Sequence, residues 1–246
     1  MNLECLWNRI DMIFCMKKIV LFFGVLIMAV MFAASASAQS VWASAGLKAG
    51  LAKGLAATAE GEYRTHDGME RTERFSGAAG LEYKALPFLK FNAAYTFIYQ
   101  QSEPQGESEP ESLQAASGAM TAAFWQPKHR FSVAATGSVD WGSMTFSLRE
   151  RYQMTYSSRS DSYKNVLRSR IMAEYEIAET GLTPFVSAEM YSYLKGLSYD
   201  KTKVTAGVGY QIDSHNSVEL YYRYIDHKDD DEDNGHVIGV GYSFSF

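Results

Sequence analysis

Two Asp–His dipeptides come closest, among the residues of this chain, to a pattern that could do chemistry. In His66-Asp67 and in Asp226-His227 an aspartate could orient an imidazole that deprotonates a water molecule. Adjacent residues of a strand point to opposite faces, so a working dyad would need Asp67 with His227, or Asp226 with His66. The sequence has no G-x-S-x-G, H-E-x-x-H, Walker A or C-x-x-C motif. We therefore expect a protein that is not an enzyme and has no catalytic residue, with a hydrolase built on an extracellular Asp–His dyad as an alternative.

The most acidic stretch of the chain, residues 226–235, offers a candidate cation site. Asp229, Asp231 and Asp233 recur at the i, i+2, i+4 spacing of a calcium-binding loop. An EF-hand loop would place glycine directly after the third ligand and glutamate six residues later, and neither is present here. We expect a solvated acidic loop, no metal and no cofactor. A surface-binding protein that captures a cation on this loop is a second alternative.

The composition indicates which elements must position these residues. At 246 residues, the chain fits one domain. Hydrophobic residues make up 47% and aromatic residues 14%, which excludes a disordered chain. The net charge of −5 argues against a nucleic-acid partner. Abundant aromatic residues and glycine, with only five prolines, favour strands over helices.

The N-terminal segment is typical of a cleaved export signal. A basic start at Met16-Lys17-Lys18 precedes an apolar run over residues 19–32, which is shorter than the ~20 residues that cross a bilayer as a helix. The predicted cleavage site consists of Ala36, Ala38 and Gln39. We interpret residues 1–15 as an over-extended start, residues 16–38 as the signal peptide and residues 39–246 as the mature domain. Both cysteines lie in residues 1–15, so the mature chain is predicted to have no disulfide and no thiolate metal site.

Period-two alternation recurs along the predicted mature chain. In residues 55–64, small and aromatic side chains share one face and charged side chains share the other. In residues 144–155, apolar positions alternate with polar ones such as Arg149 and Arg151, and Glu150 alone breaks the pattern. Each strand is therefore expected to have one apolar and one polar face. A soluble sandwich and a membrane barrel both produce this pattern.

Strand length and loop order favour the barrel. The alternating segments run for about 10–14 residues, whereas soluble strands usually have about 5–6 and membrane strands about 9–11. Short turns such as Lys53-Gly54 alternate with long polar loops such as residues 102–112. Aromatic residues gather near strand ends, as the interface girdles of a membrane barrel require. These residues are Tyr95, Tyr99, Trp141, Tyr152, Tyr156, Tyr191, Tyr193, Tyr221, Tyr222 and Tyr224.

The C-terminus carries a further signal. Tyr242, Phe244 and Phe246 alternate on one face and resemble the signal read by the bacterial barrel assembly machinery. The sequence thus predicts an all-β, transmembrane, antiparallel up-and-down β-barrel in the bacterial outer membrane, after signal-directed export. Its expected partners are membrane lipid, lipopolysaccharide and the assembly machinery; the oligomeric state is left open.

The number of strands is predicted as ten or twelve, because bacterial single-chain barrels have an even number and eleven segments alternate clearly. A further strand over residues 113–125 would give twelve. If residues 41–51 did not span, ten would remain, and all short turns would then fall on the periplasmic side. We favour ten.

The polar faces of these strands are predicted to line a narrow lumen. We expect either a filled interior of mutually paired charges, hence a structural membrane protein, or a porin-like channel for small solutes. The expected lumenal charges are Glu60, Glu62, Arg64, Arg149, Arg151, Arg168, Arg170, Glu174, Glu189 and Arg223.

Several short motifs carry a family resemblance over residues 41–246. They are E-G-E-Y-R at 60–64, G-L-E-Y-K at 80–84, F-N-A-A-Y at 91–95, H-R-F at 129–131, S-L-R-E-R-Y-Q at 147–153 and Y-Y-R-Y at 221–224. With these motifs the chain resembles domain of unknown function family 2490, a family of outer-membrane β-barrels from Bacteroidota. The resemblance implies a fold and a compartment, but it supplies no activity and no catalytic residue.

Overall fold

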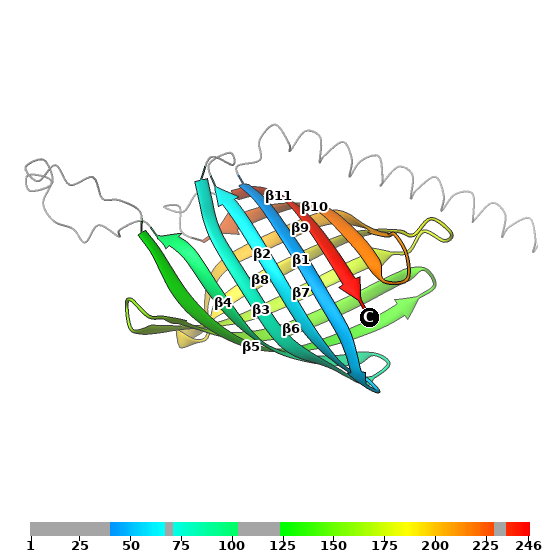
Figure 1. The fold of residues 1–246 in the computed structure, drawn as a ribbon, viewed down its shortest axis with the longest axis horizontal. Helices are drawn as coiled ribbons and strands as arrows, with labels where there is room; N and C mark the ends of the chain where they lie inside the picture. The colour runs from blue at the N-terminus through cyan, green and yellow to red at the C-terminus, as the bar shows by residue number, and fades with distance from the viewer. Residues whose placement is uncertain (1–39, 67–70, 103–123, 229–234) are drawn as a thin grey trace, which may run out of the picture.

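Long, tilted strands make up nearly all of the computed structural model, which describes residues 40–66, 71–102, 124–228 and 235–246 (Figure 1). The strands have 11 to 18 residues, enough to cross a membrane when tilted. A single 3-10 turn, η1 (Lys195–Leu197), interrupts them, and no helix in the described ranges is long and apolar enough to cross a membrane. The strands are β1 (Ser40–Ala52), β2 (Leu55–His66), β3 (Arg71–Leu86), β4 (Leu89–Ser102), β5 (Phe124–Trp141), β6 (Met144–Ser157), β7 (Ser162–Tyr175), β8 (Leu182–Tyr193), β9 (Ser198–Gln211), β10 (Asn216–His227) and β11 (Gly235–Ser245).

The strands close into one barrel in the order β1-β11-β10-β9-β8-β7-β6-β5-β4-β3-β2. Every strand pairs antiparallel with its neighbour in sequence, and β1 closes the barrel by pairing parallel with β11, from Ser40↔Val237 to Lys48↔Ser245. Figure 1 shows β1 in blue beside β11 in red, with both running in the same direction. A closed barrel satisfies the backbone hydrogen bonds of every strand without a free edge, which a lipid environment requires.

The described residues contain eleven strands, a number between the predicted ten and twelve. Residues 41–51, which the ten-strand count leaves out, lie in the fully paired β1. Of the extra strand in the twelve-strand count, residues 113–123 lie outside the described residues, and Phe124 and Trp125 begin β5, which pairs directly with β4. An even number is needed only when every neighbouring pair is antiparallel. The parallel seam between β1 and β11 removes that requirement.

Five connections of two to six residues lie at one rim of the barrel, called here the short-turn rim. They join β1 to β2, β3 to β4, β5 to β6, β7 to β8 and β9 to β10. In the first, Gly54 has φ +76°, and a Cβ there would lie 2.8 Å from the Lys84 carbonyl oxygen, so glycine is required. The other connections and the start of β1 lie at the opposite, long-loop rim. The turns expected to be tight thus share one rim with eleven strands, although the β7–β8 connection (176–181) is longer than the β6–β7 (158–161) and β8–β9 (194–197) connections at the opposite rim.

The outer face of the barrel is apolar and exposed. Leu81, Phe131 and Val133 are each at least half exposed, as are Leu148 and Ile171. Near the long-loop rim, aromatic side chains contact their neighbours around this face, with ring centroids 4.9–5.9 Å apart. The contacts join Tyr63 to Phe75, Phe75 to Trp125, Tyr99 to Trp125 and Tyr156 to Tyr163. This is the arrangement of a lipid-facing belt edged by an aromatic girdle.

Three tyrosines assigned to the girdle from sequence face inward instead. One is Tyr193, which pairs with the buried Val166 and contacts Lys164, both of which line the lumenal cavity. Tyr191 and Tyr221 are only 9% and 8% exposed, and both pack beside lumenal arginines. The prediction was wrong for these three residues because proximity to a strand end does not reveal which face a residue occupies. That face is fixed by the alternation from the neighbouring lumenal residues, Glu189 and Arg223.

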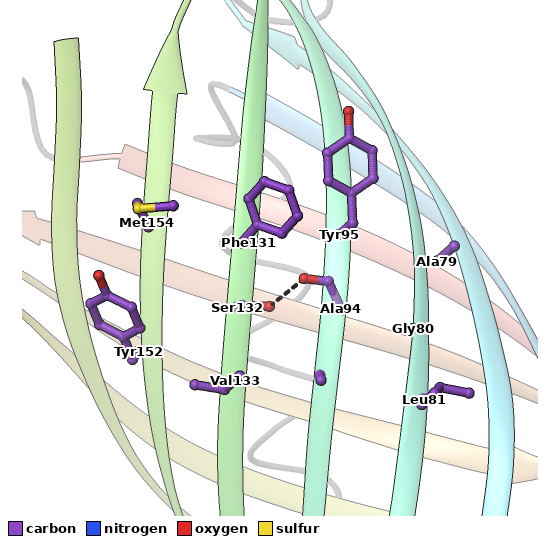
Figure 2. A pocket seen from close by; sticks show the side chains of 11 residues that line it. Ala79, Gly80, Leu81, Ala94, Tyr95, Phe131, Ser132, Val133, Tyr152 and Met154 are labelled. Atoms are coloured by element: carbon purple, nitrogen blue, oxygen red, sulfur yellow. Dashed lines mark hydrogen bonds between the residues drawn. The ribbon is translucent and has the colours of Figure 1, made fainter.

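The outer face is hollowed over β3–β6 into a shallow groove of about 380 Å³. Figure 2 shows Ala79 and Leu81 of β3 on one side of it, and Tyr152 and Met154 of β6 on the other. The ring of Phe131 lies between them and packs against Tyr95, with centroids 5.1 Å apart. The groove exists because small residues of β3 and β4 leave the backbone uncovered between larger neighbours.

Candidate functional site in the barrel lumen

The lumen contains a cavity of about 850 Å³ whose lining is strongly basic. Its lining reaches from Lys48 and Ser245, near the short-turn rim, to Lys128 and Lys164, near the long-loop rim. Basic side chains outnumber acidic ones in this lining by twelve to four. The whole chain, in contrast, carries a net charge of −5. Positive charge is therefore concentrated inside the barrel, where it creates a potential that attracts anions.

The densest part of this lining is an arginine block on β6 and β7, defined as Arg149, Arg151, Arg168 and Arg170. The antiparallel register places Arg149 directly opposite Arg170, and Arg151 directly opposite Arg168. Residues at alternate positions of a strand share a face, so all four belong to the lumenal face. Like charges placed directly opposite each other destabilise a sheet, and two successive rungs of them need compensation.

Glu189 of β8 compensates half of the arginine block. Its Oε1 accepts a hydrogen bond from Arg149 Nη2 at 2.8 Å, and its Oε2 accepts one from Arg168 Nη2 at 2.7 Å. The Tyr191 hydroxyl also donates to Oε2, at 3.1 Å. The three ion-paired side chains are only 10–15% exposed. Burial keeps water from screening these ion pairs, so they hold Arg149 and Arg168 firmly in place.

A second acid-centred cluster lies on β2 and β3. Glu62 accepts from Arg64 Nη2 at 2.8 Å and from Arg74 Nη2 at 2.6 Å, and the Ser76 hydroxyl donates to it at 3.3 Å. As with Glu189, one carboxylate holds two guanidinium groups, so each cluster keeps a net positive charge. The carboxylates of these two clusters are thus fully paired, while bases remain in excess in the cavity lining.

The indole ring of Trp42 contacts three of the lumenal cations. Trp42 of β1 is 4% exposed, and its ring lies 3.5 Å from the guanidinium carbon of Arg64. Lys203 Nζ and the guanidinium carbon of Arg223 approach the same ring at 4.9 and 5.0 Å. Cation–π contact is more favourable when desolvated, as it is here. Trp42 forms a small apolar cluster with Ile225 and Val237 near the long-loop rim.

The structure places the lumenal charges expected from sequence on the inner face. Seven of them line the cavity: Glu60, Glu62, Arg64, Arg149, Arg151, Arg168 and Arg223. Glu189 forms ion pairs with Arg149 and Arg168 of this lining. Arg170 and Glu174 share the lumenal face of β7 with Arg168 by alternation. Sequence reasoning left out Arg74, Lys128 and Arg130, which also line the cavity. The alternation around Phe131 pointed to Arg130, whereas Arg74 lies in a segment that was not assigned a face.

The structure does not bring His66 and Asp226 together. Their strands, β2 and β10, are separated by β1 and β11, which corresponds to about 14 Å at the usual strand spacing. His227, the other candidate, lies with its Nε2 3.2 Å from Lys201 Nζ. Its proposed partner Asp67 is outside the described residues, so the structure tests only the dyad of Asp226 and His66.

Other predicted sites fall partly outside the structure. The cleavage residues Ala36, Ala38 and Gln39 lie outside the described residues, as do Asp229, Asp231 and Asp233. In the ranges that are described, no group of three His, Cys, Asp or Glu side chains could hold a metal ion. The C-terminal Tyr242 and Phe246 are exposed, and Phe244 stacks on His215 with centroids 6.1 Å apart.

Comparison with known proteins confirms the family and the fold. The model of the family described as "Protein of unknown function (DUF2490)" matches residues 39–236. No relative was found among curated proteins. The β-domain of the Bordetella autotransporter BrkA is similar in structure, with a TM-score of 0.53 and 14% identity over 80% of this chain and 86% of that one. Outer-membrane expressed OmpT of Vibrio cholerae has a TM-score of 0.39 and 11% identity over 70% of this chain and 54% of that one. The fold is that of outer-membrane β-barrels.

Proposed function

We propose that this chain, which belongs to the DUF2490 family, is an outer-membrane protein that acts as a narrow channel for small anionic solutes. The observation that carries the proposal is the cavity in the lumen, whose basic side chains exceed its acidic ones by twelve to four. A cationic passage raises the local concentration of anions and repels cations.

The outer face supports the membrane location. Its large apolar side chains are exposed around the barrel, and water would make such a surface unfavourable. The groove over β3–β6 in Figure 2 is lined mostly by apolar side chains, so part of a lipid acyl chain could lie in it. Lipid and lipopolysaccharide are thus the expected surroundings, and the alternation ending at Phe246 is the expected signal to the assembly machinery.

The size of the lumen supports a narrow channel. Eight-stranded barrels are filled by their own side chains, whereas aqueous porins have about sixteen strands or more. Eleven strands fall between these limits and leave a cavity of about 850 Å³. Small hydrated anions are the solutes that this space and charge would accept.

The test is ion selectivity in planar bilayers. We expect discrete conductance with anion preference, measured as a reversal potential in a salt gradient. Replacing Arg149 and Arg151 together (Arg149→Glu, Arg151→Glu) should lower the anion-to-cation permeability ratio by about ten-fold or more. Arg159→Glu makes the same change in the exposed connection between β6 and β7 and should alter the ratio far less. Cation preference in the unaltered protein would contradict the proposal.

A structural role without conductance is the second candidate. The cluster of Trp42, Ile225 and Val237, together with the two acid-centred clusters, fills part of the interior with packed side chains. A barrel that shifts on electrophoresis when boiled, yet gives no conductance at any potential, would favour this role.

A hydrolase and a cation-binding surface protein have less support. The strands that carry His66 and Asp226, β2 and β10, are separated by β1 and β11. The acidic residues 229–233 lie outside the described residues. A hydrolase would lose turnover on His227→Ala or His66→Ala. A cation binder would lose its ligand when residues 229–233 are replaced.

A further inference from the structure

The arginine block has more donors than the protein supplies with acceptors. Glu189 is ion-paired to Arg149 and Arg168, which are diagonal to each other across the two strands. Arg151 and Arg170, on the other diagonal, form no ion pair with it. The Nε atoms of all four arginines are buried with no acceptor among the described residues. Buried donors of this kind are costly unless an acceptor reaches them.

The strand beside the block leaves space for such an acceptor. On β5, Ala134 lies opposite Arg151, and Thr136 lies opposite Arg149. These two positions carry small side chains, so nothing long from β5 covers the guanidinium groups. Arg149, Arg151 and Arg168 accordingly line the lumenal cavity. On β5 the same cavity is lined by Arg130 and Ser132, so a small solute in it can reach Arg151 from that side.

The charge and geometry of the block define the ligand class. Four guanidinium groups and one carboxylate leave a net charge of about +3 in a partly buried site. Guanidinium groups bind oxyanions through two parallel N–H···O hydrogen bonds, and phosphate or sulfate offers enough oxygens for several such forks. A monovalent halide has the charge but lacks this geometry.

We propose that Arg149, Arg151, Arg168 and Arg170 form a binding site for a small tetrahedral oxyanion of the phosphate or sulfate type. Arg151, which lines the cavity, contacts the ligand, and Arg170, opposite Arg149, adds positive charge beside it. Glu189 acts as a positioning residue that fixes Arg149 and Arg168. The site rests on the proposed function, because the anion must reach the lumen, but binding requires access from only one rim and no conduction.

The experiment is a titration of the detergent-purified protein with inorganic phosphate by calorimetry, at constant ionic strength kept with sodium chloride. We expect saturable binding at one site that persists in chloride. Arg151→Gln with Arg170→Gln should weaken phosphate binding at least about ten-fold, because the first removes charge-assisted hydrogen bonds to the ligand and the second removes a neighbouring positive charge. These substitutions leave both ion pairs of Glu189 intact. Arg151→Gln alone serves if the double variant fails the heat-modifiability test for a folded barrel.

The matched control is Arg223→Gln, which removes one lumenal charge on β10, three strands away from β7. It should weaken binding by no more than about two-fold, through the general field alone. If Arg223→Gln and Arg151→Gln weaken phosphate binding equally, the lumen attracts anions without a discrete site, and the inference falls while anion selectivity stands. If the unaltered protein conducts anions selectively but does not bind phosphate, only the site is overturned. If it shows neither binding nor anion preference, both proposals fail.

Discussion

The lumenal and outer faces of the β6–β7 hairpin have opposite chemistry although they alternate along the same strands. The lumenal face carries the arginine block, held by Glu189. The outer face carries exposed apolar side chains such as Leu148 and Ile171. Its one carboxylate, Glu150, sits near the middle of β6 and accepts a hydrogen bond from the Ser169 hydroxyl at 2.7 Å.

The two faces differ in how they stabilise charged side chains. In the lumen, arginines accumulate because a polar cavity and buried carboxylates stabilise them. On the outer face, a lone carboxylate has only a hydroxyl for compensation. Four sets of substitutions test how each part of the barrel stabilises its charges.

The largest effect is expected at Glu189. Glu189→Ala leaves Arg149 and Arg168 buried without their counter-charge, so we expect a loss of about 3–5 kcal/mol in the free energy of unfolding. Urea unfolding of the protein in lipid vesicles, followed by tryptophan fluorescence, measures it. Glu219→Ala removes a lumenal carboxylate for which no such double ion pair is seen, and should cost much less. Equal losses would show that Glu189 has no special role.

A charge moved to the wrong face is expected to have the next largest effect. Leu148→Lys places an ammonium group in the lipid-facing belt and should cost about 2–4 kcal/mol in the same measurement. Ser147→Lys makes the adjacent change on the lumenal face and should cost much less. If both variants unfold at the same urea concentration, the outer face does not contact hydrocarbon.

Removing the exceptional carboxylate should have a smaller effect of opposite sign. Glu150→Leu restores the apolar alternation, and we expect a gain of roughly 1 kcal/mol in the free energy of unfolding in vesicles. Ser169→Ala, which removes only the hydroxyl partner, should give a small loss. A clear loss with Glu150→Leu would indicate that the Glu150 carboxylate binds something within the membrane.

The smallest effect concerns the turn between β9 and β10, outside the membrane-spanning strands. Asp213 accepts hydrogen bonds from the backbone N–H groups of His215 and Asn216 and from the Asn216 side chain, which lowers its pKa below the usual 3.8. A lowered folded-state pKa means that this stabilisation is complete above about pH 3.8 and is lost as the pH falls through the folded-state value. Asp213→Ala should therefore lower the midpoint of urea unfolding at pH 7. The difference from the unaltered protein should shrink as the pH falls below 3.8, and a constant difference would contradict it.

The face of each residue was largely readable from the sequence, and its partners were not. Alternation around Leu148 assigned Arg149 and Arg151 to the polar face and marked Glu150 as the exception. It could not place Arg170 opposite Arg149, because cross-strand register depends on the length and geometry of each turn. The assignment of Tyr191, Tyr193 and Tyr221 to the girdle was wrong because it rested on their closeness to strand ends and not on the alternation, which puts all three on the lumenal face.

By itself, the sequence determined the fold class, the family and the inward or outward side of most strand residues, because period-two alternation and composition are local properties. Only the tertiary structure decided that β1 closes the barrel parallel to β11, which makes eleven strands. Only closure brings strands distant in sequence around one space, so that Trp42 of β1 meets Lys203 of β9 and Arg223 of β10. The positive sign of the lumen has the same origin, since it depends on which of the chain's many charges share the enclosed face.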